Sequence, residues 1–188
     1  MPRMSASEKQ KSHNRILDAA ARLLREKGIG ATSVSDVMQA AGLTHGGFYR
    51  HFTSKDDLVA RAFSHAVGEV VGEMEAASPG QERVAAREQY IATYLSPEHV
   101  GNTGGGCPLA AMGAGVSRTK NDTKQEGAAA ADRVAALLQR NEDVQNGRAV
   151  LAMLIGTIVL ARLATTSGEA RAILQDGQTG VNLLQEHW

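Results

Sequence analysis

The stretch Ser33–Lys55, SVSDVMQAAGLTHGGFYRHFTSK, decides the fold of this chain. Ser33 and Asp36 form an N-terminal capping pair, and apolar residues then recur at helical spacing. Gly42 ends this helix, because a residue that tolerates positive φ closes such a turn at little cost. Thr44 is expected to cap a second short helix. The stretch therefore predicts a helix-turn-helix, a motif whose second helix enters the major groove of DNA.

The same residues resemble the TetR family of bacterial transcription regulators. The matching pattern is T-S-V-S-D-V, A-G-L, G-x-F-Y-x-H-F and S-K-D-D-L, and it follows an amphipathic helix. The rest of the chain matches the family only in length, helical character and domain order. The resemblance implies a DNA-binding domain over residues 1–55 and a ligand-binding and dimerisation domain over residues 56–188.

The formal charge is unevenly placed along the 188 residues, although it sums to zero. Residues 1–55 carry nine Lys and Arg against four Asp and Glu, whereas residues 56–188 carry eleven against sixteen. A basic N-terminal part on an acidic remainder indicates a polyanionic partner at the N-terminal end. Ordinary solvated helix faces are the alternative reading of this asymmetry.

Cysteine content and hydropathy indicate a cytoplasmic chain that does not span a membrane. The single cysteine rules out an intramolecular disulfide, and residues 1–15 lack an apolar signal region. The longest apolar run, Ala149–Ala161, is thirteen residues long, whereas a membrane-spanning helix needs about 20. Ala is abundant and alternating Val-rich runs are lacking, so the expected fold is all-α.

Helices are expected along the whole chain. We predict one over residues 7–27, two within 33–52, one from 55 to a break at 78–80, and further helices over 81–95, 108–117, 122–139, 148–165 and 169–186. Val84, Tyr90, Ile91 and Tyr94 are expected to point inward. Residues 96–106 are predicted to form a Gly-rich loop, and residues 141–147 separate two helices.

Two glycines in the second helix of the motif suggest a close approach to another surface. Gly46 and Gly47 each cost about 1 kcal/mol against alanine in a helix, although they could simply loosen it. Arg50 can pair with a guanine edge, and Lys55 lies where a helix start can meet a phosphate. By resemblance to the TetR pattern, His45, Gly47, Tyr49 and His51 contact bases or backbone. The full set of expected DNA contacts is Thr32, Ser33, Thr44, His45, Gly46, Gly47, Tyr49, Arg50, His51 and Lys55.

The C-terminal part carries no catalytic constellation, so we predict neither an enzyme nor a cofactor. Gly101–Gly106 lacks the Lys and Ser or Thr of a phosphate-binding loop, and no pair of histidines has metal-ligand spacing. The resemblance implies a small-molecule pocket here, and Met and Tyr would suit an apolar or amphipathic effector. The pocket candidates, each of which could also be plain core, are His65, Met74, Tyr90, Tyr94, Cys107, Met112 and Met153.

The last two helices are the expected dimer interface, because a two-fold pair could form a four-helix bundle from them. Such a homodimer would present two recognition helices to a palindromic operator in double-stranded DNA. The expected interface residues are Ala152, Ile155, Gly156, Val159, Leu160, Leu163, Ile173, Val181 and Leu184.

Cys107 leaves two readings open. It precedes Pro108 at a helix start, where the thiolate is favoured, so it could sense oxidants or electrophiles. It could equally be a small buried residue that fills a gap. We therefore expect a TetR-like repressor released by a small ligand. The alternatives are a redox-sensing regulator and, more remotely, a small α-helical enzyme with its site near Cys107.

Overall fold

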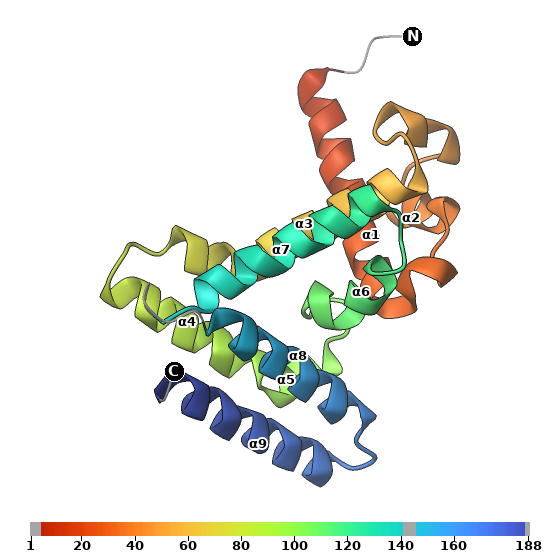
Figure 1. Cartoon of the computed structure of the whole chain (residues 1–188). Coiled ribbons are helices and arrows are strands. Elements are labelled where there is room, and N and C mark those ends of the chain that lie inside the picture. The colour runs from red at the N-terminus through yellow and green to blue at the C-terminus, as the bar shows by residue number, and fades with distance from the viewer. Residues whose placement is uncertain (1–4, 141–145, 187–188) are drawn as a thin grey trace.

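The computed structural model describes residues 5–140 and 146–186, and within these residues it contains helices and no strand (Figure 1). The all-α prediction is confirmed. The elements follow in the order α1 Ala6–Ala31, α2 Val34–Ala40, the 3₁₀ helix η1 His45–Arg50, α3 Lys55–Ala76, α4 Gln81–Tyr94, α5 Pro97–Gly101, α6 Pro108–Val116, α7 Asn121–Leu138, α8 Gly147–Leu163 and α9 Ser167–Glu186. We call α1, α2 and η1 the head and the elements after α3 the body.

Side-chain caps fix the starts of α2 and α3, as the sequence predicts. The Ser33 hydroxyl accepts a 3.1 Å bond from the Asp36 N–H, and the Asp36 carboxylate accepts a 2.9 Å bond from the Ser33 N–H. The Ser54 hydroxyl accepts the Asp57 N–H at 3.0 Å. These bonds satisfy N–H groups that a helix start otherwise leaves unpaired.

The turn after α2 depends on a glycine and on an arginine from α1. Gly42 has φ of +66°, the left-handed conformation that its position at a helix end predicts. One guanidinium nitrogen of Arg15 donates to the carbonyl groups of Ala41 and, at 3.3 Å, Gly42. The end of α2 is therefore held against α1.

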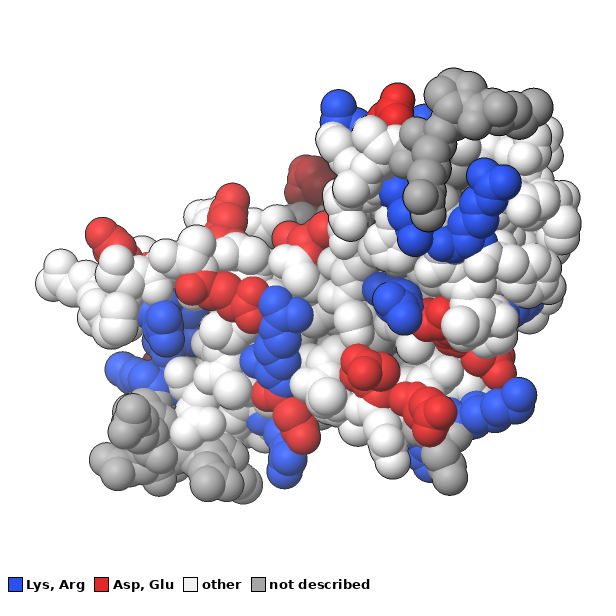
Figure 2. Space-filling view, turned by 90° about the horizontal axis from the view of Figure 1, so that it is seen from above, with Lys and Arg blue, Asp and Glu red and all other residues white. Residues whose placement is uncertain are grey.

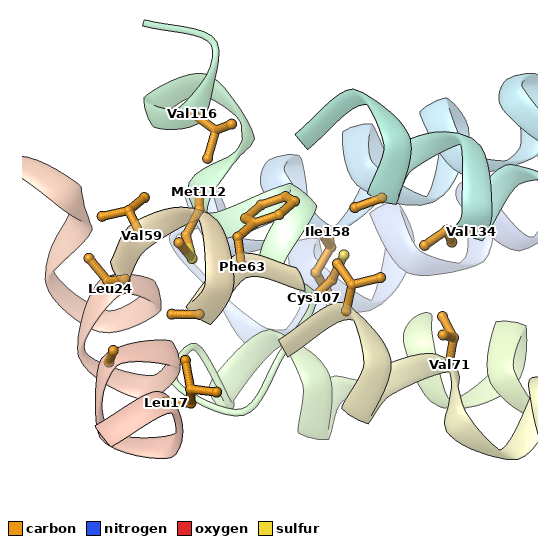
Figure 3. Close-up of a cluster of buried hydrophobic side chains, with 14 of the residues drawn as sticks. Leu17, Leu24, Val59, Phe63, Val71, Cys107, Met112, Val116, Val134 and Ile158 are labelled. Atoms are coloured by element: carbon orange, nitrogen blue, oxygen red, sulfur yellow. The ribbon is translucent and has the colours of Figure 1, made fainter. Parts of the chain in front are cut away.

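The core runs without a break from the head into the body along α3 (Figures 1 and 3). In Figure 3, Leu17 and Leu24 of α1 face Val59 and Phe63 of α3. Residues of the body such as Val134 and Ile158 continue the same cluster, and both are at most 1% exposed. Because α1 packs on one part of α3 and α7 on another, α3 belongs to the head and the body alike.

α8 and α9 lie side by side at the edge of the body farthest from the head (Figure 1). A Cβ atom at Gly177 of α9 would lie 2.4 Å from the side chain of Thr157 on α8, so the glycine allows the two helices to approach closely. Several large apolar side chains of this pair remain exposed, namely Met153, Val159, Leu160, Leu163 and Leu183.

The structure differs from the sequence-based expectations in several places. The second helix of the motif is a 3₁₀ helix, and Thr44 precedes it without the expected side-chain capping bond. Residues predicted to be loop contain α5, which begins at Pro97 after the capping residue Ser96. Val84 was expected to point inward but is 41% exposed, because the buried face of α4 is formed by Arg87, Ile91 and Tyr94 instead. Of the expected break over residues 141–147, residues 141–145 lie outside the described residues. Among the described helices, none combines the length and the apolar character needed to cross a bilayer.

Candidate nucleic-acid interface and body cavity

The tip of the head presents most of the side chains expected to contact DNA. Tyr49 is 74% exposed. The other exposed members of the set are Ser33, Thr44, His45, Gly46 and Arg50, and the half-buried members are Gly47, His51 and Lys55.

An aromatic cluster under η1 holds this tip in place. Phe48 and Phe52 are 1% and 2% exposed, and their ring centroids lie 5.6 Å apart. His13 of α1 stacks on Phe52 at 4.8 Å. Tyr49 meets Phe48 edge-on at 5.2 Å and points outward. The alternation of inward and outward rings lets a short helix that contains two glycines present a fixed polar surface.

The side chain of Thr32 was expected to contact DNA, and the structure contradicts this expectation. The residue is 1% exposed, and its hydroxyl donates to the Gly28 carbonyl at 2.8 Å. It therefore closes the end of α1, where Gly28 departs from helical geometry with φ of +82°. The hydroxyl of Ser33, one residue later, is at the surface.

Basic side chains surround a shallow cleft between α1 and η1. Lys9, His13, Arg50 and His51 line it with Ala6 and Gln10. Burial lowers the pKa of both histidines, and the nearby cations Lys9 and Arg50 add to the effect on His51. In Figure 2, Lys and Arg side chains lie at several places over the face seen from above, with Asp and Glu side chains between them. The positive charge of the cleft therefore comes from Lys and Arg rather than from the histidines, and it suits the binding of a phosphate backbone.

The body contains a mainly apolar cavity of about 260 Å³ between α3, α4, α5 and the loop before α6. Three of the expected pocket residues, Tyr90, Tyr94 and Cys107, line it. The sequence reasoning missed the other lining residues, which are Val70, Thr93, Ser96, Glu98, His99, Asn102, Gly105 and Gly106. The Gly-rich run before Cys107 was a sequence signal for this site, because glycines leave the backbone itself to form part of the cavity wall.

The remaining pocket candidates lie elsewhere. Met74 and Met112 are 2% and 1% exposed and belong to the core, whereas Met153 is 37% exposed on α8 and packs near Gly180 of α9. His65 is on α3, where it contacts Asp18 of α1 rather than the cavity. These four residues therefore do not line this cavity, because each one is used in helix packing elsewhere.

His99 lies in the wall of the cavity, and two hydrogen bonds hold its ring in one tautomer. Its Nδ1 lies 2.7 Å from the Tyr94 carbonyl oxygen, which can only accept, so Nδ1 carries the hydrogen. Its Nε2 then accepts the N–H of Cys107 at 3.0 Å. Burial lowers the pKa of His99, which favours this neutral form. Both ring nitrogens are therefore engaged by the backbone.

Cys107 is a buried thiol at the start of α6 (Figure 3). It is 3% exposed, and burial raises its pKa in spite of the opposing effects of the Tyr94 hydroxyl, the N–H groups of Ala110 and Leu109, and Arg162. The same burial, reinforced by the thiol, raises the pKa of Tyr94. These conditions favour the reading of Cys107 as a packing residue over a reactive sensor.

Arg25 connects this wall to the head. Its side chain is 5% exposed, and Nη1 donates to the Gly106 carbonyl at 2.9 Å. Nε donates to the Ala21 carbonyl of α1 at 3.0 Å, and Nη2 lies 3.8 Å from a Glu69 carboxylate oxygen on α3. One side chain thus joins the loop beside the cavity to α1 and α3.

Comparison with known proteins places this geometry among bacterial regulators. The profile of a family described as "Bacterial regulatory proteins, tetR family" matches residues 16–62. An uncharacterised HTH-type transcriptional regulator of Mycobacterium tuberculosis is 30% identical over 137 residues, which cover 72% of this chain and 68% of the relative. The HTH-type transcriptional regulator AcrR of Shigella flexneri is 35% identical over 94 residues, 48% of this chain and 44% of that protein. The chain thus spans less than half the length of this second relative.

Solved structures share the fold across the whole chain. A TetR transcriptional regulator from Legionella pneumophila superposes with a TM-score of 0.70 at 16% identity, covering 95% of this chain and 98% of its own. The similarity in fold therefore includes the body, where the sequence matches the family only in length, helical character and domain order.

Native Cys107 should react slowly with iodoacetamide. The thiol is buried and its pKa is raised, so both access and the thiolate fraction are low at neutral pH. We expect a rate at pH 7 that is far below the rate of the unfolded chain and that rises only on the alkaline side of the ordinary thiol range. Because the chain has one cysteine, Cys107→Ser is a control that should take up no label. Rapid labelling of folded protein at neutral pH would restore the sensor reading.

Proposed function

Because the chain belongs to the TetR family of bacterial regulatory proteins, we propose that it is a one-component transcriptional repressor that binds operator DNA as a homodimer and is released by a small molecule. The observation that carries the proposal is the tip of the head. There, an exposed and mainly polar surface lies on a buried aromatic cluster, beside a cleft lined by Lys9 and Arg50. Its exposed residues are Thr44, His45, Gly46, Tyr49 and Arg50. The cytoplasm, where bacterial DNA lies, is the expected compartment.

The proposed DNA interface combines the exposed residues of η1 with the starts of α2 and α3. Ser33 and Lys55 lie in or beside the first turns of these helices, where N–H groups and a positive dipole end favour phosphate. His45, Gly46, Gly47 and Tyr49 are proposed to face the major groove, with Thr44, Arg50 and His51 at its margin. The side chain of Thr32 is no longer included.

The proposed dimer forms through α8 and α9. Val159, Leu160 and Leu163 are 39%, 56% and 72% exposed, an apolar surface that a monomer would leave in water. Ala152 and Gly156 are exposed on the same helix, and Ile155, Ile173 and Leu184 are half-buried. Val181 is withdrawn from the expected interface, because it is 0% exposed within its own chain.

The proposed effector site is the body cavity. Its volume of about 260 Å³ lies just below the range of about 300–1,000 Å³ that is typical of small-molecule sites, and its lining is mainly apolar. A compact apolar or amphipathic compound is the proposed effector. It would release DNA only as far as it binds the DNA-incompetent conformer more tightly than the competent one.

Two sets of contacts join the body to the head and could transmit the effect of effector binding. Arg25 links the cavity wall to α1 and α3. The N-terminal part of α7 contacts the first half of α3. Lys120, just before α7, lies 3.3 Å from Asp56, and Ser64 donates to Glu126 at 3.2 Å. Movement of α3 at Val70, or of the loop before α6, around a ligand would therefore reach α1 through Arg25 and α7 through these contacts, and would change the spacing of the two heads.

The arrangement of His99 argues against an enzyme with its site at Cys107. A histidine that activates a thiol needs a ring nitrogen free to take the proton, whereas His99 donates from Nδ1 to Tyr94 and accepts the Cys107 N–H at Nε2. The raised pKa of Cys107 also works against a thiolate nucleophile. We therefore propose a regulator that has no catalytic activity of its own.

The phosphate contact proposed for Lys55 predicts a change in salt dependence. Lys55→Ala should weaken binding about equally on promoter DNA from upstream of its own gene and on random DNA. It should also reduce the slope of log affinity against log salt by about 1 for each subunit that uses the contact. Arg118→Ala removes the same charge from an exposed site on the body and should change neither quantity. Gel shifts at several salt concentrations measure both, and an unaltered slope in Lys55→Ala would refute the assignment.

The exposed apolar face predicts that one charge should separate the subunits. Leu160→Glu places a carboxylate in the proposed interface and should convert a micromolar dimer into monomers, with loss of operator binding because two half-sites are needed. Ala128→Glu makes a comparable change on the exposed face of α7 and should remain dimeric. Size-exclusion chromatography with light scattering reads out the mass. A monomeric wild-type protein would contradict the proposed dimer.

Filling the cavity should block the effector site without disturbing the head. The fluorescent amphipathic probe 2-naphthol should bind the wild-type protein, and Thr93→Trp should weaken its binding at least tenfold because Thr93 lines the cavity. Ala85→Trp, about two turns earlier on the exposed face of α4 and outside the cavity lining, is the matched control and should bind normally. Equal affinity in both variants would show that the probe binds elsewhere. Gel shifts with both variants check that the head is intact.

A further inference from the structure

Asp18, His65 and Glu69 form a cluster of metal-ligating groups that the DNA interface and the cavity do not use. His65 Nε2 lies 2.7 Å from Asp18 Oδ1 and 3.6 Å from Glu69 Oε1. One potential ligand atom from each residue lies within 4.8 Å of those from the other two. His65 and Glu69 are four residues apart on α3 and so share one face, and Asp18 reaches them from α1.

An ordinary ion pair explains only part of this cluster. The Asp18–His65 contact is a good hydrogen bond, but the histidine offers one Nε2 to two carboxylates. Arg25 lies 3.8 Å from the other oxygen of Glu69, Oε2, while its guanidinium donates to the Ala21 and Gly106 carbonyl groups. Within the described part of the chain, Glu69 Oε1 lies against the His65 imidazole, which carries a positive charge only when it is protonated.

We propose that Asp18, His65 and Glu69 bind one divalent transition-metal ion, with Zn²⁺ the best match. One imidazole nitrogen and two carboxylate oxygens suit Zn²⁺, whereas Mg²⁺ and Ca²⁺ prefer all-oxygen sites and Cu⁺ prefers sulfur. Bonds of about 2.0–2.2 Å around a tetrahedral ion require ligand atoms about 3.4 Å apart. His65 Nε2 lies 2.7 Å from Asp18 Oδ1 and 3.6 Å from Glu69 Oε1, on either side of that value, and the ligand atoms of Asp18 and Glu69 lie within 4.8 Å of each other.

The cluster is also accessible. The side chains of His65, Asp18 and Glu69 are 28%, 58% and 48% exposed, which gives an ion an entry path and leaves a coordination position for water. Arg25 on Glu69 Oε2 would then serve as an outer partner that orients the carboxylate. A bound ion would tie α1 of the head to the middle of α3 and so stabilise their packing.

The test uses the full-length, tag-free protein, stripped of metal with a chelator and then titrated with Zn²⁺. Calorimetry should show one ion per chain, and the melting temperature should rise with Zn²⁺ concentration, as it does for any ligand that prefers the folded state. Co²⁺ in place of Zn²⁺ should give a visible absorption band characteristic of a low-coordinate site that contains nitrogen. Absence of both binding and stabilisation at 100 µM Zn²⁺ would overturn the proposal.

Variants locate the ion. His65→Gln and Asp18→Asn should each weaken Zn²⁺ binding by more than the roughly 10–100-fold that loss of an outer-shell partner costs. Glu73→Gln removes the same charge one turn further along the exposed face of α3 and should bind as the wild type does. Asp18→Asn keeps the test valid if His65→Gln is unstable. Binding that survives in His65→Gln and Asp18→Asn but is lost in His51→Gln would assign the ion to the His13–His51 pair and overturn the proposal.

Discussion

The burial of α3 by two different partners is the constraint on which the rest of this molecule depends. Ala62, Ala66 and Val67 in its middle are 0% exposed. Their small side chains let α1 and α7 approach the helix closely, and Phe63 fills the space between the head and the body. Since well-packed interiors are close to incompressible, α3 cannot rotate on one side without disturbing the other. Because both of its faces are packed, α3 can transmit a movement between the body and the head along its length.

Arg25 makes the second connection between the parts, and its chemistry differs from that of the apolar core. A guanidinium that is almost completely buried is costly unless its donors are used, and this one donates to two backbone carbonyl groups and lies near Glu69. Burial lowers its pKa, but an arginine remains charged at neutral pH. The loop beside the cavity is thus held to α1 by a directional contact that lysine could not reproduce, because lysine lacks the planar fork.

Local signals in the sequence were sufficient for the head but not for the cavity. The capping serines, Gly42 and the apolar spacing act over a few residues, and each appears in the structure as predicted. The 3₁₀ geometry of η1 was not predictable, because it depends on how Phe48 and Phe52 fit against His13 of another helix.

The cavity illustrates why the rest could not be predicted. Its wall combines Val70, Thr93 and His99 from three different elements, and no spacing along the chain brings them together. Thr32 and Val181 show the converse. Each has the residue type expected at an interface, but tertiary packing uses it internally. The cluster of Asp18, His65 and Glu69 left one local trace, a histidine and a glutamate four residues apart, whereas Asp18 lies 47 residues before His65.

The contact of Arg15 with the end of α2 has a consequence for the order in which the chain folds. It spans only 26 residues, so the head can close as soon as its own sequence has left the ribosome. The pairing of α3 with α7 must wait: the bond between Ser64 and Glu126 spans 62 residues. During that interval the part of α3 that α7 later covers stays exposed. Translation speed across residues 77–120 would then set how long a nascent chain exposes this surface to aggregation.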